Sequence, residues 1–322
     1  MPGDAVIRAW HDGVVDADAV AVAARALRDH HVVGMPTETV YGLAAGATDE
    51  AAVSRVFAIK GRPVDHPVIV HVADASALGR WSREVPGYAR RLAQALWPGP
   101  LTLVVPAADS VPRFVTGGQD TVGLRCPAHP VALALIEAAG PVAAPSANRF
   151  GQVSPTSAAD VVTDIGDRLE SQDVILDGGD CPVGVESTIL DCTGDRPRVL
   201  RWGAVELSEI EEAGRVSVST EASAVRAPGG LVSHYAPRAQ VRLGSAAGPG
   251  DGFLALDSVP TPAGAIRLAT PATTRDYAAV LYRALRDTDS LAIDEVWALP
   301  PDDGTALSTA IRDRLARAAV SR

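Results

Sequence analysis

Short runs rich in Val, Ile and Leu alternate along this chain with longer stretches whose apolar residues recur at helical spacing. Such runs predict buried strands, and the amphipathic stretches predict helices. Helices are expected at 49–59, 87–97, 130–139 and 157–169. The alternation indicates an α/β fold with a largely buried, partly parallel sheet, and two successive runs near 187–203 predict an antiparallel pair. The runs predicted as strands are HVVGMP, VIVHVA, LTLVVPA, TVGLRCP, PVAAPS, DVILDGG, STILDC and RVLRWG.

The same pattern divides the chain into three parts. Residues 1–215 form a first domain, whose last helix is predicted at 204–214. Residues 216–238 are rich in Ser, Ala, Gly and Pro and lack sustained periodicity, which predicts a linker. Residues 239–322 form a smaller α/β domain, with strands at QVRLG, GFLALDS, AIRLA and EVWALP and helices near 273–288 and 304–320.

Charge is distributed unevenly over these 322 residues. Residues 1–215 contain 28 Asp and Glu against 18 Lys and Arg, whereas the rest of the chain contains 11 of each. Proteins that bind nucleic acid through its phosphates normally carry a basic face, so the sequence does not support direct tRNA binding.

The sequence also predicts where the protein works. No secretory signal opens the sequence, and no apolar run reaches the ~20 residues of a membrane span. We therefore expect a cytoplasmic protein without membrane contact. The three cysteines, Cys126, Cys181 and Cys192, form no CxxC pair, which argues against a disulfide framework and against a metal site.

Two residue types occur once each, and both lie in dense polar stretches. Lys60, the only lysine, opens KGRPVDHPVIVH, and Asn148, the only asparagine, lies in APSANRFGQVSPT. Lys60 and Arg62 follow a predicted helix and could hold a polyphosphate, although such pairs are often solvated surface charges. His71 lies in the next strand, where a histidine is more often a satisfied core residue than a ligand contact.

Other polar residues interrupt or follow predicted strands. In PTETVYGL, an extended chain would place Thr37, Thr39 and Tyr41 on one face, before a Gly-containing turn. Arg125 lies in the apolar run TVGLRCP, where a buried guanidinium needs an anion, supplied either by a protein carboxylate or by a ligand carboxylate. The hydroxyls and amide of APSANRFGQVSPT precede a helix and suit either an anion cradle or an ordinary N-cap.

Common signatures of nucleotide enzymes and hydrolases are missing from the sequence. It contains no P-loop, no nucleophile elbow and no dinucleotide fingerprint followed by a helix.

Several segments, taken in order, resemble the threonylcarbamoyl-AMP synthase family over about residues 20–238. They are PTETVYGL, KGRPVDHPVIVH, GLRCPAHP, APSANRFGQVSPT, ESTILD, LRWGAV and SHYAP. The resemblance implies a twisted mixed-sheet, YrdC-like N-terminal domain and a smaller Rossmann-like α/β C-terminal domain. It also implies that L-threonine, bicarbonate and ATP give L-threonylcarbamoyl-adenylate and pyrophosphate, the first step of tRNA threonylcarbamoyladenosine modification. A separate transferase then acts downstream.

The resemblance further implies roles for single residues. Lys60 and Arg62 would be catalytic, neutralising charge as pyrophosphate leaves. Mg²⁺ would arrive with ATP, with no protein-only metal site, and the linker would fold back over the active site. L-threonine would be held by Thr39, His71, Arg125, Ala144 and Ser187. ATP would be held by Lys60, Arg62, His66, Thr121, Ser146, Asn148, Ser154, Arg201 and Tyr235.

The chain departs from the family pattern at three places. His66 stands where the family has Asn, Phe150 stands where a small residue is expected, and the segment before Ala144 is one residue shorter. Three other readings remain: an RNA-binding or ribosome-maturation factor, a carbamoyltransferase acting on another acceptor, and a non-catalytic regulator. The acidic balance argues against the first reading. The intact set Lys60, Arg62, Arg125, Ser146 and Ser187 gives the third no support.

Overall fold

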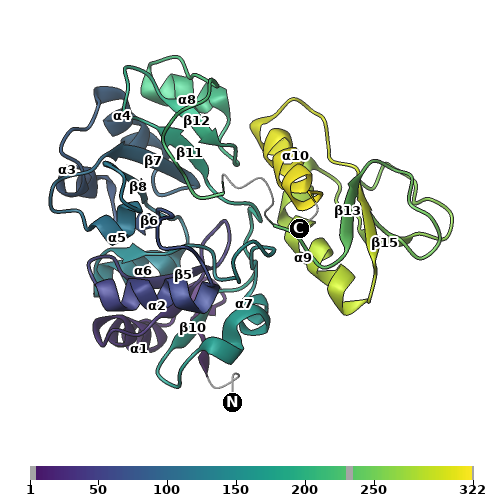
Figure 1. The fold of residues 1–322 in the computed structure, drawn as a ribbon, viewed down its shortest axis with the longest axis horizontal. Coiled ribbons are helices and arrows are strands. Elements are labelled where there is room, and N and C mark those ends of the chain that lie inside the picture. The colour runs from purple at the N-terminus through teal and green to yellow at the C-terminus, as the bar shows by residue number, and fades with distance from the viewer. Residues whose placement is uncertain (1–4, 230–234, 321–322) are drawn as a thin grey trace.

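The computed structural model describes residues 5–229 and 235–320, which form a larger and a smaller body (Figure 1). The larger body is built on a ten-stranded mixed sheet in the order β1-β10-β4-β5-β9-β6-β8-β7-β11-β12. Its strands are β1 (Val6–Arg8), β4 (Val33–Met35), β5 (Gly42–Gly46), β6 (Ile69–His71), β7 (Leu101–Pro106), β8 (Thr121–Arg125), β9 (Val142–Ala143), β10 (Val174–Asp177), β11 (Thr188–Asp191) and β12 (Arg198–Arg201), beside the hairpin of β2 (Trp10–His11) and β3 (Val14–Val15).

Helices cover this sheet unevenly. α1 and α6 pack on one face against β4, β9 and β10, whereas α2, α4, α7 and α8 pack on the other face. The helices of this body are α1 (Ala17–Arg28), α2 (Glu50–Lys60), α3 (Leu78–Trp81), α4 (Gly87–Leu96), α5 (Arg113–Thr116), α6 (Pro130–Ala139), α7 (Ala158–Ile165) and α8 (Leu207–Gly214).

Alternation along the central strands places polar residues on the face that α1 and α6 leave uncovered. Val70 and Leu124 point into the core beneath α2 and α4. His71, Thr102 and Arg125 occupy the alternate positions and line cavities on the other side, and His71 pairs with Arg125 in the parallel register of β6 and β8. The sheet therefore carries a row of polar side chains where helices do not cover it.

The smaller body has a four-stranded parallel sheet in the order β13-β16-β14-β15. Helices α9 and α10 lie between this sheet and the larger body (Figure 1). Among the residues that the structure describes, no helix is both long and apolar enough to cross a membrane. The elements are β13 (Gln240–Leu243), β14 (Gly252–Leu254), β15 (Ile266–Ala269), β16 (Glu295–Ala298), α9 (Thr274–Ser290) and α10 (Ala306–Ala318).

All eight runs predicted as strands in the first two thirds of the chain are strands, β4 and β6 to β12. The predicted antiparallel pair is β11 with β12, and the three cysteines are buried free thiols. The helix predicted at 157–169 ends at Ile165 and continues as one 3₁₀ turn, 166–168. The turn expected after PTET is instead β5, whose small residues pair with both β4 and β9.

The expectation that Tyr41 shares a face with Thr37 and Thr39 is wrong. The two threonine hydroxyl oxygens lie 2.9 Å apart. The Tyr41 hydroxyl instead donates to the Gly179 carbonyl at 2.8 Å and accepts from the Gly178 amide at 3.1 Å. The chain bends at 38–40, within the PTET motif and before β5, and there the Thr37 hydroxyl donates to the Val40 carbonyl at 2.6 Å.

Candidate active site

A cavity of about 700 Å³, including its open mouth, lies on the polar face of the large sheet. Strand ends, the loop after α2, the segment 144–151 and the linker residues Pro228, Gly229 and Tyr235 all contribute to its wall. Eleven of the fourteen site residues expected from the sequence line this one cavity. They are Thr39, Lys60, Arg62, His71, Arg125, Ala144, Ser146, Asn148, Ser187, Arg201 and Tyr235.

The single lysine and the single asparagine fix the same loop. α2 ends at Gly61, whose φ of 63° is left-handed, so Lys60 is the last residue of the helix. Its ammonium donates to the carbonyls of Ser146 and Asn148, each at 2.5 Å. The Asn148 amide donates to the carbonyls of Arg149 and Gln152 at 2.8 and 2.9 Å. Both side chains therefore hold the turn that runs along the cavity wall.

Lys60 and Arg62 carry their charges in a poorly solvated place. Burial, followed by the nearby charge of Arg62, lowers the pKa of Lys60 well below its usual range. Burial also lowers the pKa of Arg62 to about 10. The Arg62 guanidinium donates to the Pro67 carbonyl at 2.8 Å, but its Nε makes no hydrogen bond within the described residues. Two poorly solvated cations therefore line the cavity, and an anion bound there would stabilise both.

Arg125 meets a protein carboxylate, which is one of the two kinds of anion that the sequence left open. Its Nη2 lies 2.7 Å from Oε1 of Glu38, and its Nη1 donates to the Thr39 hydroxyl at 2.9 Å. Burial lowers the pKa of the adjacent His71 to about 3, so this imidazole is neutral at physiological pH. Its Nδ1 has no hydrogen-bond partner among the described residues. Arg125, Thr39 and His71 thus offer a positive charge, a hydroxyl and a neutral imidazole at one end of the cavity.

Ser187 and Arg201 form a second polar group. The Ser187 hydroxyl lies 2.7 Å from the Thr102 hydroxyl and accepts from Arg201 Nη2 at 3.0 Å. Arg201 also donates from Nη1 to the Pro228 carbonyl of the linker at 3.2 Å. A Cβ on Gly229 would lie 2.7 Å from the Tyr235 hydroxyl oxygen, and the φ of 89° at this position favours glycine. The linker therefore packs closely against the cavity wall.

Glu186 is the carboxylate in the wall, and it is fully engaged. Its oxygens accept from the Ser154 hydroxyl at 2.6 Å, from the Tyr282 hydroxyl at 2.9 Å and from Arg314 Nε at 3.0 Å. Burial alone would raise its pKa, but the guanidinium groups of Arg314 and Arg201 lower the pKa of Glu186 to about 2. The carboxylate is therefore ionised at neutral pH.

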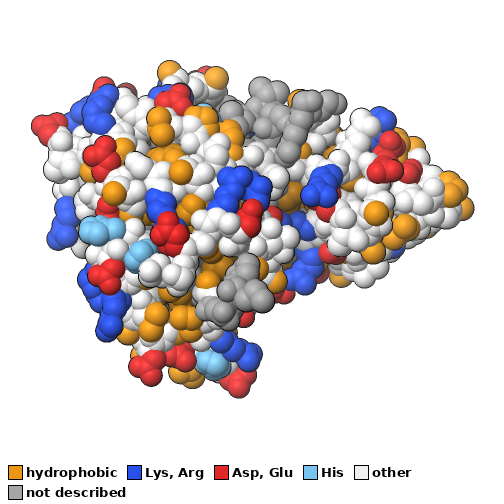
Figure 2. All heavy atoms as spheres, turned by 60° about the horizontal axis from the view of Figure 1, so that its bottom comes forward, with side chains coloured by type: hydrophobic (Ala, Val, Ile, Leu, Met, Phe, Trp, Pro, Cys, Tyr) orange, Lys and Arg blue, Asp and Glu red, His pale blue; other side chains and the backbone are white. Residues whose placement is uncertain are grey.

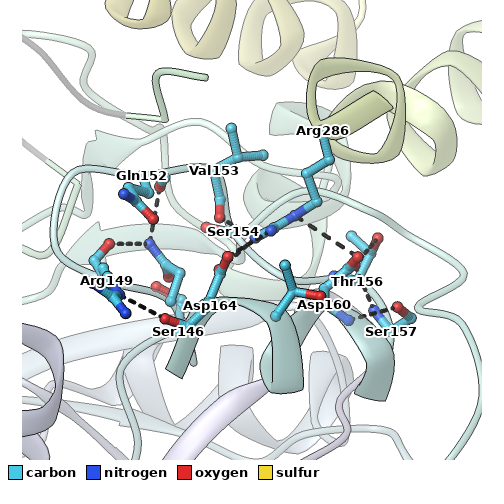
Figure 3. A network of polar contacts seen from close by, with 12 residues as sticks. Ser146, Arg149, Gln152, Val153, Ser154, Thr156, Ser157, Asp160, Asp164 and Arg286 are labelled. Atoms are coloured by element: carbon cyan, nitrogen blue, oxygen red, sulfur yellow. Dashed lines mark hydrogen bonds and ion pairs between the residues drawn. The ribbon is translucent and has the colours of Figure 1, made fainter. Parts of the chain in front are cut away.

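The loop that Lys60 and Asn148 hold against the cavity is also bound from its other side by the smaller body (Figure 3). Arg286 of α9 donates to both carboxylate oxygens of Asp164, at 2.8 and 2.7 Å, and to the Val153 carbonyl. Val153 follows the turn that contains Ser146 and Arg149. The loop is thus bound on one side by Lys60 and on the other by α9.

Three expected site residues lie outside the cavity lining. His66 contacts the cavity residue Phe150 edge to face, with ring centroids 5.4 Å apart. Two of the three departures from the family pattern, His66 and Phe150, therefore pack against each other. Thr121 lies in an adjoining small cavity under Arg226 and Pro228. Ser154 is fully buried and donates to Glu186.

Sequence reasoning missed Glu38, Thr102 and the partners of Glu186. Glu38 lies inside the PTET motif, and Thr102 is a hydroxyl at an alternate position of the apolar run LTLVV, so both left a local signal. Tyr282 and Arg314 lie 96 and 128 residues from Glu186 in the chain, and no local pattern links them to it.

Potential metal ligands do not cluster in the described part of the chain. Within residues 5–229 and 235–320, no group of three or more His, Cys, Asp or Glu side chains is placed to hold a metal ion. On the face shown in Figure 2, Arg and Asp or Glu side chains are interspersed and form no broad basic stripe.

The chain is similar to proteins of one family along most of its length. A family model described as "Telomere recombination" matches residues 25–203, and one described as "Threonylcarbamoyl-AMP synthase, C-terminal domain" matches residues 205–320. The threonylcarbamoyl-AMP synthase of Pyrococcus abyssi is 47% identical over 229 residues, which cover 69% of this chain and 66% of that protein. The Bacillus subtilis protein of the same name is 44% identical over 231 residues, covering 70% and 66%.

These alignments span about two thirds of the length of the curated relatives, 66% in both cases. A crystal structure of P. abyssi Sua5 complexed with L-threonine superposes with a TM-score of 0.86 at 37% identity, covering 98% of this chain and 97% of that one. The similarity thus includes both bodies.

Proposed function

Because this chain belongs to the threonylcarbamoyl-AMP synthase family, we propose that it synthesises L-threonylcarbamoyl-adenylate from L-threonine, bicarbonate and ATP. Pyrophosphate is the second product, and the adenylate serves a separate transferase that modifies tRNA. The observation that carries the proposal is the convergence of cations, hydroxyls and a neutral imidazole in one cavity.

L-threonine binds at the end of the cavity formed by Thr39, His71, Arg125, Ala144 and Ser187. Arg125 attracts the amino acid's carboxylate, and Glu38 fixes the orientation of its guanidinium. The neutral imidazole of His71 and the hydroxyl of Ser187 are available for hydrogen bonds to the amine and hydroxyl of threonine.

ATP binds toward Lys60, Arg62, Ser146, Asn148, Arg201 and Tyr235. The Lys60 ammonium has three N–H donors, two of which are used by loop carbonyls. The Nε of Arg62 donates to no group within the described residues. These two side chains neutralise charge on the departing pyrophosphate and are the proposed catalytic residues. Ser154 acts through Glu186, while His66 and Thr121 border the site from outside the cavity lining.

The chemistry proceeds in two steps. The neutral amine of threonine bonds to the carbon of bicarbonate, and the bicarbonate hydroxyl leaves with one amine proton as water, which gives the carbamate. A carbamate oxygen then attacks the α-phosphorus, and the bond to the β-phosphate oxygen breaks to release pyrophosphate. Because a carbamate decomposes in water, the site must exclude solvent while it forms. The linker contacts at Pro228, Gly229 and Tyr235 support a covering role for that segment; Ser233 and His234 lie outside the described residues.

The residues present do not fit a protein-held magnesium ion. Glu38 is paired with Arg125, and Glu186 is bound by Arg314, Tyr282 and Ser154. Any magnesium therefore enters on the phosphates of ATP.

Pyrophosphate release with ATP, tested for each amino acid with and without bicarbonate, distinguishes the proposal from its rivals. The synthase reading requires release that depends on both threonine and bicarbonate. Release that is independent of the amino acid would instead indicate a carbamoyltransferase acting on another acceptor. Steeply salt-dependent RNA binding without turnover would indicate an RNA-binding protein.

A further inference from the structure

Two side chains of the smaller body reach the wall of the cavity. Arg314 of α10 and Tyr282 of α9 both bind the Glu186 carboxylate, at 3.0 and 2.9 Å. The Arg314 side chain is 0% exposed and that of Glu186 is 7% exposed. This ion pair is therefore shielded from solvent, and breaking it by removing one partner leaves an uncompensated charge.

Glu186 is negatively charged, whereas the charged side chains beside it in the cavity lining are positive. Lys60, Arg62 and Arg201 line the same space and would give it the positive potential that a triphosphate needs. An unneutralised carboxylate in this wall would repel phosphates and attract the nearest guanidinium, because charges interact strongly in a poorly solvated site. Arg201 is such a group: its Nε and Nη2 donate to the carbonyl and hydroxyl of Ser187, the residue after Glu186, each at 3.0 Å, and its charge contributes, after that of Arg314, to the low pKa of Glu186.

We infer that Arg314 is a positioning residue for nucleotide binding, which holds the Glu186 carboxylate away from Arg201 and so leaves Arg201 available to the phosphates of ATP. The inference rests on the proposed function, because it takes ATP as the anion. It gives the smaller body a part in the active site.

The same guanidinium also contacts the linker. It lies 5.6 Å from the centre of the Tyr235 ring, and that ring stacks on Tyr282 with centroids 5.7 Å apart. Tyr235 has a φ of 63°, a left-handed conformation that residues with a side chain adopt only when their surroundings enforce it. Arg314 thus contacts both the wall residue Glu186 and the buried linker residue Tyr235, which also lines the cavity.

The test compares wild type with Arg314→Met, Glu186→Gln and the double variant, and uses Arg312→Met as the matched control. Arg312 lies on the same helix and pairs with the exposed Asp302 at 2.6 Å. The measurements are the KM for ATP and for threonine in pyrophosphate release, the Kd for ATP, and the melting temperature. Arg314→Met is expected to raise the KM and Kd for ATP at least tenfold, and to raise the KM for threonine less. Arg312→Met is expected to leave all of them unchanged.

The double variant separates positioning from simple stability. The Glu186→Gln side chain can still hydrogen-bond Ser154 and Tyr282 but has no charge to attract Arg201, so ATP affinity should recover toward that of the Glu186→Gln single variant. An ATP affinity in the double variant no better than in Arg314→Met would overturn the inference, even if the single variant folds poorly. A lower melting temperature in Arg314→Met with an unchanged KM for ATP would overturn it as well. If wild type shows no threonine-dependent release, the proposed function itself fails.

Discussion

Replacing Lys60 by Met keeps a long unbranched side chain at the end of α2 but removes the ammonium and both of its hydrogen bonds. The carbonyls of Ser146 and Asn148 then lose their donor, the first in a part-buried contact and the second in a buried one. Because these carbonyls belong to the turn that lines the cavity, the substitution acts on stability and on ATP binding together.

The magnitude follows from two opposing terms. A buried acceptor that loses its partner costs about 1–3 kcal/mol, so two carbonyls cost about 2–6 kcal/mol. Removing a desolvated ammonium, whose lowered pKa reflects its burial, offsets part of this loss. We expect the free energy of unfolding to fall by about 2 kcal/mol and the rate of pyrophosphate release to fall at least about tenfold, or 1.4 kcal/mol in the activation free energy.

The assay combines urea denaturation with steady-state pyrophosphate release below the melting temperature of each variant. Val56→Ala is the matched control, because Val56 lies buried in the same helix and its side chain does not line the cavity. It should lose comparable stability while keeping its turnover and its KM for ATP. Wild-type stability and wild-type turnover in Lys60→Met would refute the reasoning. An equal loss of activity in Lys60→Met and Val56→Ala would mean that Lys60 contributes to turnover only by stabilising the fold.

Three further predictions concern other parts of the structure. Burial lowers the pKa of His71 to about 3, so below pH 6.5 the unfolded state takes up a proton that the native state does not. The free energy of unfolding should therefore fall by about 2 kcal/mol between pH 6.5 and pH 5. In His71→Asn, urea denaturation should show that this part of the pH dependence is lost. Truncation after Ala213 should leave a folded first domain with strongly reduced pyrophosphate release, because Glu186 loses two partners; full activity would refute this. Gly203→Ala should lower turnover at least about tenfold, since its Cβ would lie 2.3 Å from a backbone nitrogen beside the site, whereas Gly79→Ala meets open space and should be neutral.

The sequence predicted the sheet better than the helices and turns around it. Runs of Val, Ile and Leu identify strands because both faces of a central strand are buried. α1 was not predicted, because its buried face consists mainly of alanine. β5 was mistaken for a turn, because its sequence GLAAG contains the small residues typical of turns, although it pairs on both sides.

The site was predicted as a set of residues rather than as a set of contacts. Motifs marked Lys60, Asn148 and Arg125 because rare or costly residue types stood out in them. Their partners did not follow from sequence: Lys60 binds carbonyls, which every residue carries, and Arg125 binds Glu38, one of 39 acidic residues. Choosing among so many carboxylates requires the fold.

The unique lysine has a practical consequence for chemical labelling. Reagents that acylate primary amines meet only the amino terminus and Lys60 in this protein, and Lys60 is 3% exposed. Acylation of Lys60, read by mass spectrometry of one peptide, therefore reports how often the 146–152 turn detaches from the helix end. Slower acylation when nucleotide is added would track closure of the pocket without any engineered probe.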